Sequence, residues 1–108
     1  MQFLMLVCRD TVPVQGAPDG DVEKWVSTMD GKGLRVAGDV LAPETEASVV
    51  RVRDGQVLVT DGPFLETKEL LGGFDLLECR DMAEAIEVAA AHPIAARGVL
   101  EIRPIWTG

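Results

Sequence analysis

Two helix-like segments, each set between strand-like runs, constrain the fold of this chain more than any other feature of its sequence. Apolar residues recur with helical spacing in residues 22–29 and again in residues 82–90, which indicates helices that bury one face. Apolar or alternating runs before and after them are typical of strands. Strands are therefore predicted at residues 1–8, 34–41, 74–79 and 99–105.

A β-hairpin is predicted around Asp54-Gly55, where valines and arginines alternate before a two-residue turn that favours positive φ angles. The expected register sets Val52 opposite Val57 and Val50 opposite Val59, so that apolar side chains pair across the strands. With this hairpin treated as an insertion, the remaining order is βαββαβ. This order predicts an α+β, ferredoxin-like domain, and 108 residues fit one domain over residues 1–108.

Aspartates mark the start of both helices. Asp19 or Asp21 is the expected N-cap of the first helix. Asp81 is the expected N-cap of the second, with Glu84 three residues later in a capping-box arrangement.

Glycines suggest two irregularities. Gly38 is a candidate β-bulge in the second strand. Residues 66–70 are expected to form one helical turn, which Gly72-Gly73 would end.

The composition argues against several classes of partner. A net charge of −8 disfavours direct binding to nucleic acid or to an anionic membrane surface. No apolar run approaches the roughly 20 residues that span a bilayer, and the N-terminus lacks signal-peptide features, so a cytoplasmic protein is expected. Two cysteines without CxxC spacing and a single histidine disfavour a zinc site. No metal or other cofactor is expected.

Residues 60–77, which include Asp61-Gly62-Pro63-Phe64, are similar to the signature of the DGPF branch of the YCII-related family. Three further segments carry the resemblance: Val52-Arg53-Asp54-Gly55, His92-Pro93 and Glu101-Ile102-Arg103-Pro104-Ile105. The resemblance implies a ferredoxin-like domain that forms a homodimeric α+β barrel through its open sheet face.

The same resemblance suggests two kinds of function. Some relatives are proposed to act on ring compounds through a histidine–aspartate pair, and others are associated with alternative sigma factors. In the wider family a histidine lies early in the first helix, but residues 22–29 contain none. The proposed pair is therefore not carried over to this chain.

Topology predicts that several polar residues gather at one end of the domain. In an antiparallel ferredoxin-like sheet, the first strand and second helix end where the third and fourth strands begin. The residues expected at this pole, with Asp39 as a further candidate, are Arg9, Asp10, residues 61–68, His92 and Arg97. Such a constellation suits a small-molecule site.

Asp61 and His92 are the candidate catalytic residues. Asp61 is a candidate general base beside the apolar Phe64, but the structural alternative, an Asx-turn before Gly-Pro, is favoured. His92 is the natural proton shuttle near neutral pH. Capping the end of the second helix, where an imidazolium can bond free carbonyls, is the favoured alternative.

The remaining candidates are ligand contacts. Phe64 stacks on a ligand ring or anchors its turn in the core, and the anchor is favoured. Lys68 is a ligand contact or part of a solvated turn. Arg9, Asp10 and Arg97 complete the expected ligand-binding set.

The sequence therefore predicts a protein that binds an unknown small molecule. Cofactor-independent acid–base catalysis on a ring or carbonyl compound, through Asp61 and His92, is the leading hypothesis. The alternative is a non-catalytic accessory or regulatory protein associated with an alternative sigma factor. A dimer that is purely structural or that sequesters a ligand is the third hypothesis.

Overall fold

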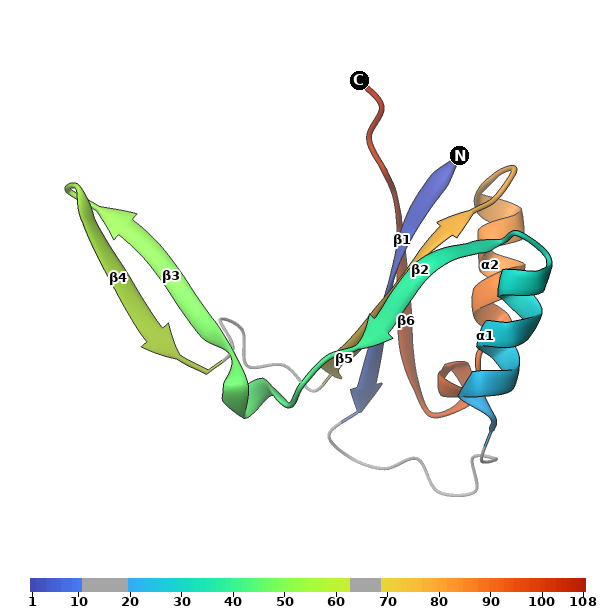
Figure 1. The fold of residues 1–108 in the computed structure, drawn as a ribbon, viewed down its shortest axis with the longest axis horizontal. Coiled ribbons are helices and arrows are strands. Elements are labelled where there is room, and N and C mark those ends of the chain that lie inside the picture. The colour runs from blue at the N-terminus through green and yellow to red at the C-terminus, as the bar shows by residue number, and fades with distance from the viewer. Residues whose placement is uncertain (11–19, 63–68) are drawn as a thin grey trace.

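A computed structural model of the chain describes residues 1–10, 20–62 and 69–108. Two α-helices lie on one face of an antiparallel sheet, and a separate hairpin stands away from it (Figure 1). In chain order the elements are β1 (Gln2–Asp10), α1 (Val22–Gly31), β2 (Arg35–Val40), the 3-10 helix η1 (Glu44–Glu46), β3 (Ser48–Arg53), β4 (Gln56–Asp61), β5 (Glu69–Glu78), α2 (Met82–Ala90), the 3-10 helix η2 (Pro93–Ala96) and β6 (Gly98–Pro104).

The main sheet has the strand order β2-β5-β1-β6, and each neighbouring pair is antiparallel. Among the described strands, β3 and β4 pair only with each other. Without the hairpin, the order is that of a ferredoxin-like fold. The α+β, βαββαβ prediction with an inserted hairpin is confirmed.

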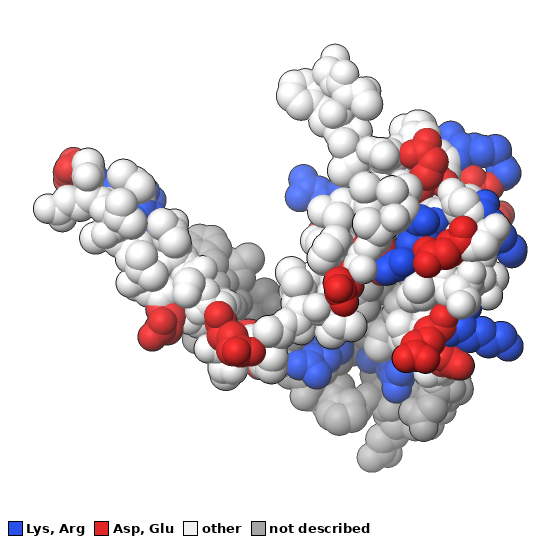
Figure 2. Space-filling view, viewed as in Figure 1, with Lys and Arg blue, Asp and Glu red and all other residues white. Residues whose placement is uncertain are grey.

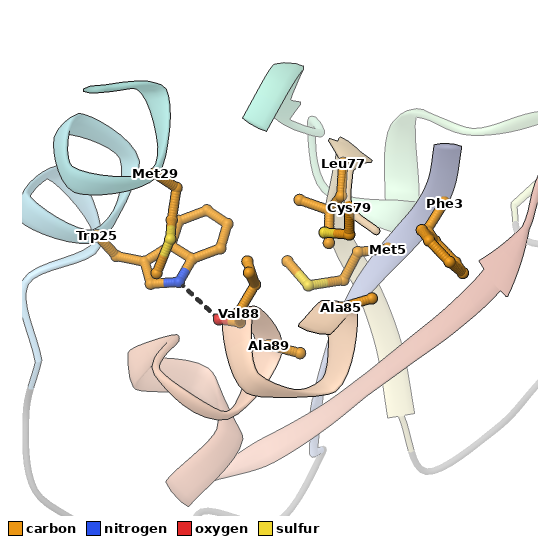
Figure 3. Packing of buried hydrophobic residues seen from close by; sticks show 9 residues of the cluster. All are labelled: Phe3, Met5, Trp25, Met29, Leu77, Cys79, Ala85, Val88 and Ala89. Carbon is orange, nitrogen blue, oxygen red and sulfur yellow. Dashed lines mark hydrogen bonds between the residues drawn. The ribbon is translucent and has the colours of Figure 1, made fainter. Parts of the chain in front are cut away.

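The hydrophobic core lies between the sheet and the two helices. Phe3 and Met5 alternate along β1 and are fully buried, as is Leu77 on β5. Trp25 of α1 packs in this cluster, and its indole N–H donates a hydrogen bond to the Val88 carbonyl of α2 at 3.0 Å (Figure 3). Trp25 thus lies on the buried face that the helical spacing of apolar residues in 22–29 predicted.

Both helices begin at the predicted aspartates. The Asp21 side chain accepts a hydrogen bond from the Lys24 N–H, and the Asp81 side chain accepts one from the Glu84 N–H. The Glu84 carboxylate in turn accepts from the Arg80 N–H, one residue before the N-cap. Side-chain oxygens thus accept hydrogen bonds from amide groups at the start of α2 that have no acceptor within the helix.

The hairpin has the predicted turn and register. Asp54 and Gly55 have φ angles of 51° and 75°, and Val52 pairs with Val57 while Val50 pairs with Val59. The hairpin is a mainly uncharged arm in the view of Figure 2, with acidic side chains near its base and both acidic and basic side chains near its tip. All four of these valines are more than half exposed, with Val57 at 67%.

The bulge in β2 lies two residues before the predicted position. Arg35 pairs with Leu77 and Ala37 with Leu76, so Val36, rather than Gly38, is the extra residue. Gly38 has a different role, because a Cβ there would lie 2.3 Å from the Asp75 Oδ1 atom. This close approach requires a residue without a side chain.

The helical turn expected at residues 66–70 is wrong for the part that the structure describes. Glu69 and Leu70 begin β5 and pair with the end of β1; residues 66–68 lie outside the described residues. Gly72 has no partner residue on β1 and forms a bulge inside this strand. Pairing with β1 overrides the local turn preference of this segment, as tertiary context commonly does.

The sheet face opposite the helices is apolar at its centre. On β1, Leu4 and Leu6 alternate with the core residues, and they lie opposite Leu76 and Phe74 of β5. The four side chains are partly exposed in the single chain. Of the helices in the described part of the chain, none has the length and apolar character needed to cross a bilayer.

Candidate functional site

A cavity of about 720 Å³ opens between α1 and the neighbouring parts of β1, β2 and β5, and His92 lies on its wall. Its volume is within the range of small-molecule sites. Much of its wall is aliphatic, contributed by Val22, Val26, Val40, Leu41, Leu71 and Ile94. A few polar groups interrupt this apolar surface.

Asp75 is the most deeply buried carboxylate on the wall. It shares the inward-facing register of β5 with Leu77, and only 6% of its surface is exposed. Its Oδ1 atom accepts a hydrogen bond from Arg35 Nε at 2.7 Å. Because a buried carboxylate is costly without a partner, this ion pair explains how a charged residue is tolerated under α1.

Arg35 uses all of its guanidinium nitrogens within the chain. Besides Asp75, it donates from Nη2 to the Gly38 carbonyl at 2.9 Å and from Nη1 to the Asp30 carboxylate at 3.1 and 3.3 Å. A Cβ at Gly38 would also lie 2.6 Å from the Phe74 carbonyl oxygen. The missing side chain of Gly38 therefore allows β2 and β5 to approach and positions the ion pair.

Burial and the neighbouring Arg35 shift the pKa of Asp75 in opposite directions. Burial raises the pKa of Asp75, while the hydrogen bond and charge of Arg35 act to lower it, and burial dominates. A buried carboxylate on a cavity wall with a pKa above its ordinary value is a good candidate for proton transfer.

His92 forms a second polar part of the wall. It is 4% exposed, and its Nδ1 atom accepts a hydrogen bond from the Ile94 N–H at 3.0 Å. Its ring meets Trp25 edge to face, with ring centroids 4.6 Å apart and an interplanar angle of 61°. Burial, and then the positive charge of Arg97, lower the pKa of His92.

These contacts define the protonation of His92. An Nδ1 atom that accepts a hydrogen bond carries no proton, so the neutral ring carries its proton on Nε2. The cap predicted for His92 is therefore at a different place: the side chain caps the start of η2 as an acceptor, not the end of α2 as an imidazolium donor. The reason is burial, which disfavours the charged ring.

Some of the residues that were predicted to gather at one end of the domain lie at the cavity. Arg9 pairs with Gly98, next to Arg97, and both Arg9 and His92 line the cavity. Arg97 follows η2 directly and does not line the cavity. Asp39, the further candidate, is also on the cavity wall.

The other predicted site residues are not brought to the cavity. Asp61 is exposed at the end of β4, opposite Ser48 at the base of the hairpin, and does not line the cavity. Asp10 is the last residue of β1, where its backbone pairs with Glu69. The side chain of Asp10, together with Phe64 and Lys68, lies outside the described residues. The roles predicted for these residues stay predictions.

Sequence reasoning missed Asp75 and Arg35. The signal for Asp75 was available, because it alternates with Leu77 and Cys79 in a strand and must face the core with them. An aspartate on the buried face of a strand is a marker of function or of a buried ion pair. Arg35 carried no comparable signal, since the bulge at Val36 decides which way it points.

Among the described residues, no group of three or more His, Cys, Asp or Glu side chains is arranged to hold a metal ion. The polar features of the cavity are instead a carboxylate–guanidinium pair and a neutral imidazole. These groups can bind, orient and exchange protons with an organic ligand.

The fold and cavity define the chain as a ferredoxin-like α+β protein with one polar site under its first helix. The YCII-related domain matches residues 4–107, and the chain belongs to this family. It is 42% identical over 69 residues to an uncharacterized protein of Rhizobium meliloti (strain 1021). That match covers 60% of this chain and 54% of the relative, so it spans about half of the relative's length. The predicted family resemblance is confirmed.

Proposed function

We propose that this protein binds a small, mainly apolar ring compound in the cavity under α1. The observation that carries the proposal is the cavity itself, which combines an aliphatic wall with a buried carboxylate and a neutral imidazole. Small-molecule sites commonly pair an apolar lining with a few well-placed polar groups. The proposal keeps the predicted class of function and moves its carboxylate from Asp61 to Asp75.

The two polar groups have complementary chemistry. Neutral His92 offers an N–H donor at Nε2 for a carbonyl or hydroxyl oxygen, while Asp75 offers a carboxylate that accepts a proton or a hydrogen bond. Because burial raises the pKa of Asp75, its carboxylate is a stronger base than an exposed aspartate. Acid–base catalysis on a bound ring or carbonyl compound, through these two residues and without a cofactor, is part of the proposal.

Trp25 gives a direct test of binding. In a Trp106→Phe background, which removes the other tryptophan at an 89% exposed position, the fluorescence of Trp25 reports on the cavity wall. We expect saturable quenching by benzyl alcohol at millimolar concentration. The larger side chain in Val26→Phe should occupy the part of the cavity next to Trp25 and weaken the quenching.

Ile86→Phe is the matched control, because Ile86 is an exposed aliphatic residue on α2 that does not line the cavity. It should bind benzyl alcohol as the parent does. Equal binding by the Val26→Phe and parent proteins would move the ligand to another surface and contradict the proposal.

A homodimer is proposed as the assembly. The apolar centre of the open sheet face, formed by Leu4, Leu6, Phe74 and Leu76, supports it, because a sheet with helices on one face needs a second layer on the other. A second copy supplies that layer symmetrically. Association with a sigma factor stays a prediction, which co-purification of the two proteins would test.

A further inference from the structure

Acidic side chains outnumber basic side chains on the cavity wall. Two arginines, Arg9 and Arg35, contribute positive charge. Four carboxylates oppose them, from Glu23, Asp39, Glu44 and Asp75. The wall therefore has a net negative charge when these groups are ionised, and it repels an anionic ligand.

Both arginines are already engaged by carboxylates of the chain. Arg35 donates to Asp75, Asp30 and the Gly38 carbonyl. Arg9 lies beside Glu44, with 3.8 Å between its Nη2 atom and Glu44 Oε2. A ligand carboxylate would have to replace one of these contacts, whereas an uncharged or cationic ligand would not.

The buried acceptor has spare capacity. Asp75 Oδ1 accepts a hydrogen bond from Arg35 Nε, and within the described part of the chain Oδ2 forms no hydrogen bond. Asp75 lies on the cavity wall, and only 6% of its surface is exposed. A carboxylate oxygen in this position accepts from an ammonium, amine or hydroxyl group of a ligand.

We propose that the cavity selects ring compounds that carry an amine or hydroxyl donor, neutral or cationic, and rejects carboxylates. In this arrangement the donor of the ligand meets Asp75 Oδ2, and its apolar ring packs against the aliphatic wall. The inference rests on the proposed function, since it concerns the ligand of the same cavity. It adds the charge and hydrogen-bonding class of that ligand.

Three probes of matched size test the inference: benzylamine, benzyl alcohol and benzoate. The indole N–H of Trp25 is the only tryptophan side-chain signal in a Trp106→Phe protein, and its nuclear magnetic resonance shift follows each titration. We expect benzylamine and benzyl alcohol to bind, and benzoate to bind at least about tenfold more weakly than benzylamine. Benzoate binding as tightly as benzylamine would overturn the inference and leave the proposed function intact. Failure of all three probes to bind would reject both.

Asp75→Asn tests which residue sets the preference, with Asp39→Asn as a control at the exposed edge of the cavity. We expect Asp75→Asn to reduce the preference for benzylamine over benzoate about tenfold, because Arg35 loses its buried partner. Asp39→Asn should change the preference less. Equal effects would assign selectivity to the general charge of the wall and overturn the role of Asp75. If Asp75→Asn does not fold, Glu23→Gln is measured instead. A tenfold loss of the preference for benzylamine over benzoate in Glu23→Gln would likewise overturn the role of Asp75.

Discussion

Single residues decide the chemistry of the cavity, and His92 is the clearest case. A histidine is the side chain most readily moved across neutral pH by its surroundings. Here burial and Arg97 both favour the neutral ring, and the Ile94 N–H fixes the proton on Nε2. His92 is thus held neutral, with its proton on Nε2, over the pH range in which an exposed histidine would begin to charge.

Replacing His92 by glutamine should change how stability depends on pH. Because the folded pKa of His92 lies below its ordinary value of about 6.5, the unfolded chain binds more protons just below that pH. The free energy of unfolding therefore falls as the pH is lowered through about 6.5, towards the folded pKa. Urea unfolding at several pH values should show a flatter dependence for His92→Gln than for the parent. An unchanged slope would contradict the assignment, since Asp75 contributes equally to both proteins.

Gly38→Ala should destabilise the protein by about 1–3 kcal/mol, because the added Cβ meets Asp75 and the Phe74 carbonyl in a packed site. Gly31→Ala is the matched control. It lies in α1 with no atom within 4 Å of the added Cβ, so it should be neutral or stabilising by up to about 1 kcal/mol. Chemical denaturation measures both changes. Equal stability of the two variants would show that Gly38 does not position the ion pair.

At the scale of elements, regular patterns in the sequence predicted regular structure. The helical spacing of Val22, Trp25 and Met29, and the alternation of valines around Asp54-Gly55, each identified an element and its buried or paired face. Such patterns are local, so they are readable without the rest of the fold. The start of β5 was not readable in this way, because its pairing with β1 comes from residues far away in sequence.

The candidate site could be predicted only in part for the same reason. Strand order brought Arg9 and His92 to one pole, as topology required. Asp61 is the last residue of β4, and β4 belongs to the separate hairpin instead of the main sheet. The order of residues along the chain does not show whether a residue between two strands lies with the hairpin or with the main sheet. The bulge at Val36, which orients Arg35, likewise depends on residues far away in sequence.

The cap of α2 gives a prediction at this scale. Asp81→Ala should lower the free energy of unfolding by about 1 kcal/mol, because the Glu84 N–H loses its acceptor. Glu87→Ala, at an exposed position inside the same helix, should have a smaller effect. Thermal denaturation followed by circular dichroism checks the difference, and a loss in Glu87→Ala as large as that in Asp81→Ala would argue against the cap.

At the scale of the molecule, the single chain is less compact than its length suggests. Its radius of gyration is 15.9 Å, against about 13 Å for a compact chain of this length. The hairpin that stands away from the sheet accounts for this extension (Figure 1). Exposed valines on the hairpin and the apolar open face of the sheet leave much hydrophobic surface for an assembly to cover.

The proposed dimer predicts a mass twice that of the 11.6 kDa chain in size-exclusion chromatography with light scattering. Val99→Lys should shift the protein to a monomer, because Val99 lies opposite Cys8 on the open face and a charge there opposes burial. Ile86→Lys, a substitution at another exposed aliphatic residue, on α2, should stay dimeric. A monomeric parent protein would refute the dimer.

The central claim is that neutral His92 and buried Asp75 form the polar part of a ligand cavity. The chain has one histidine, so nitrogen-15 nuclear magnetic resonance of the imidazole ring tests the claim directly. We predict a neutral ring at pH 7, protonated on Nε2, with an Nε2 signal that shifts when benzyl alcohol is added. A charged ring at pH 7, or an Nε2 signal that stays constant while benzyl alcohol binds, would contradict the account.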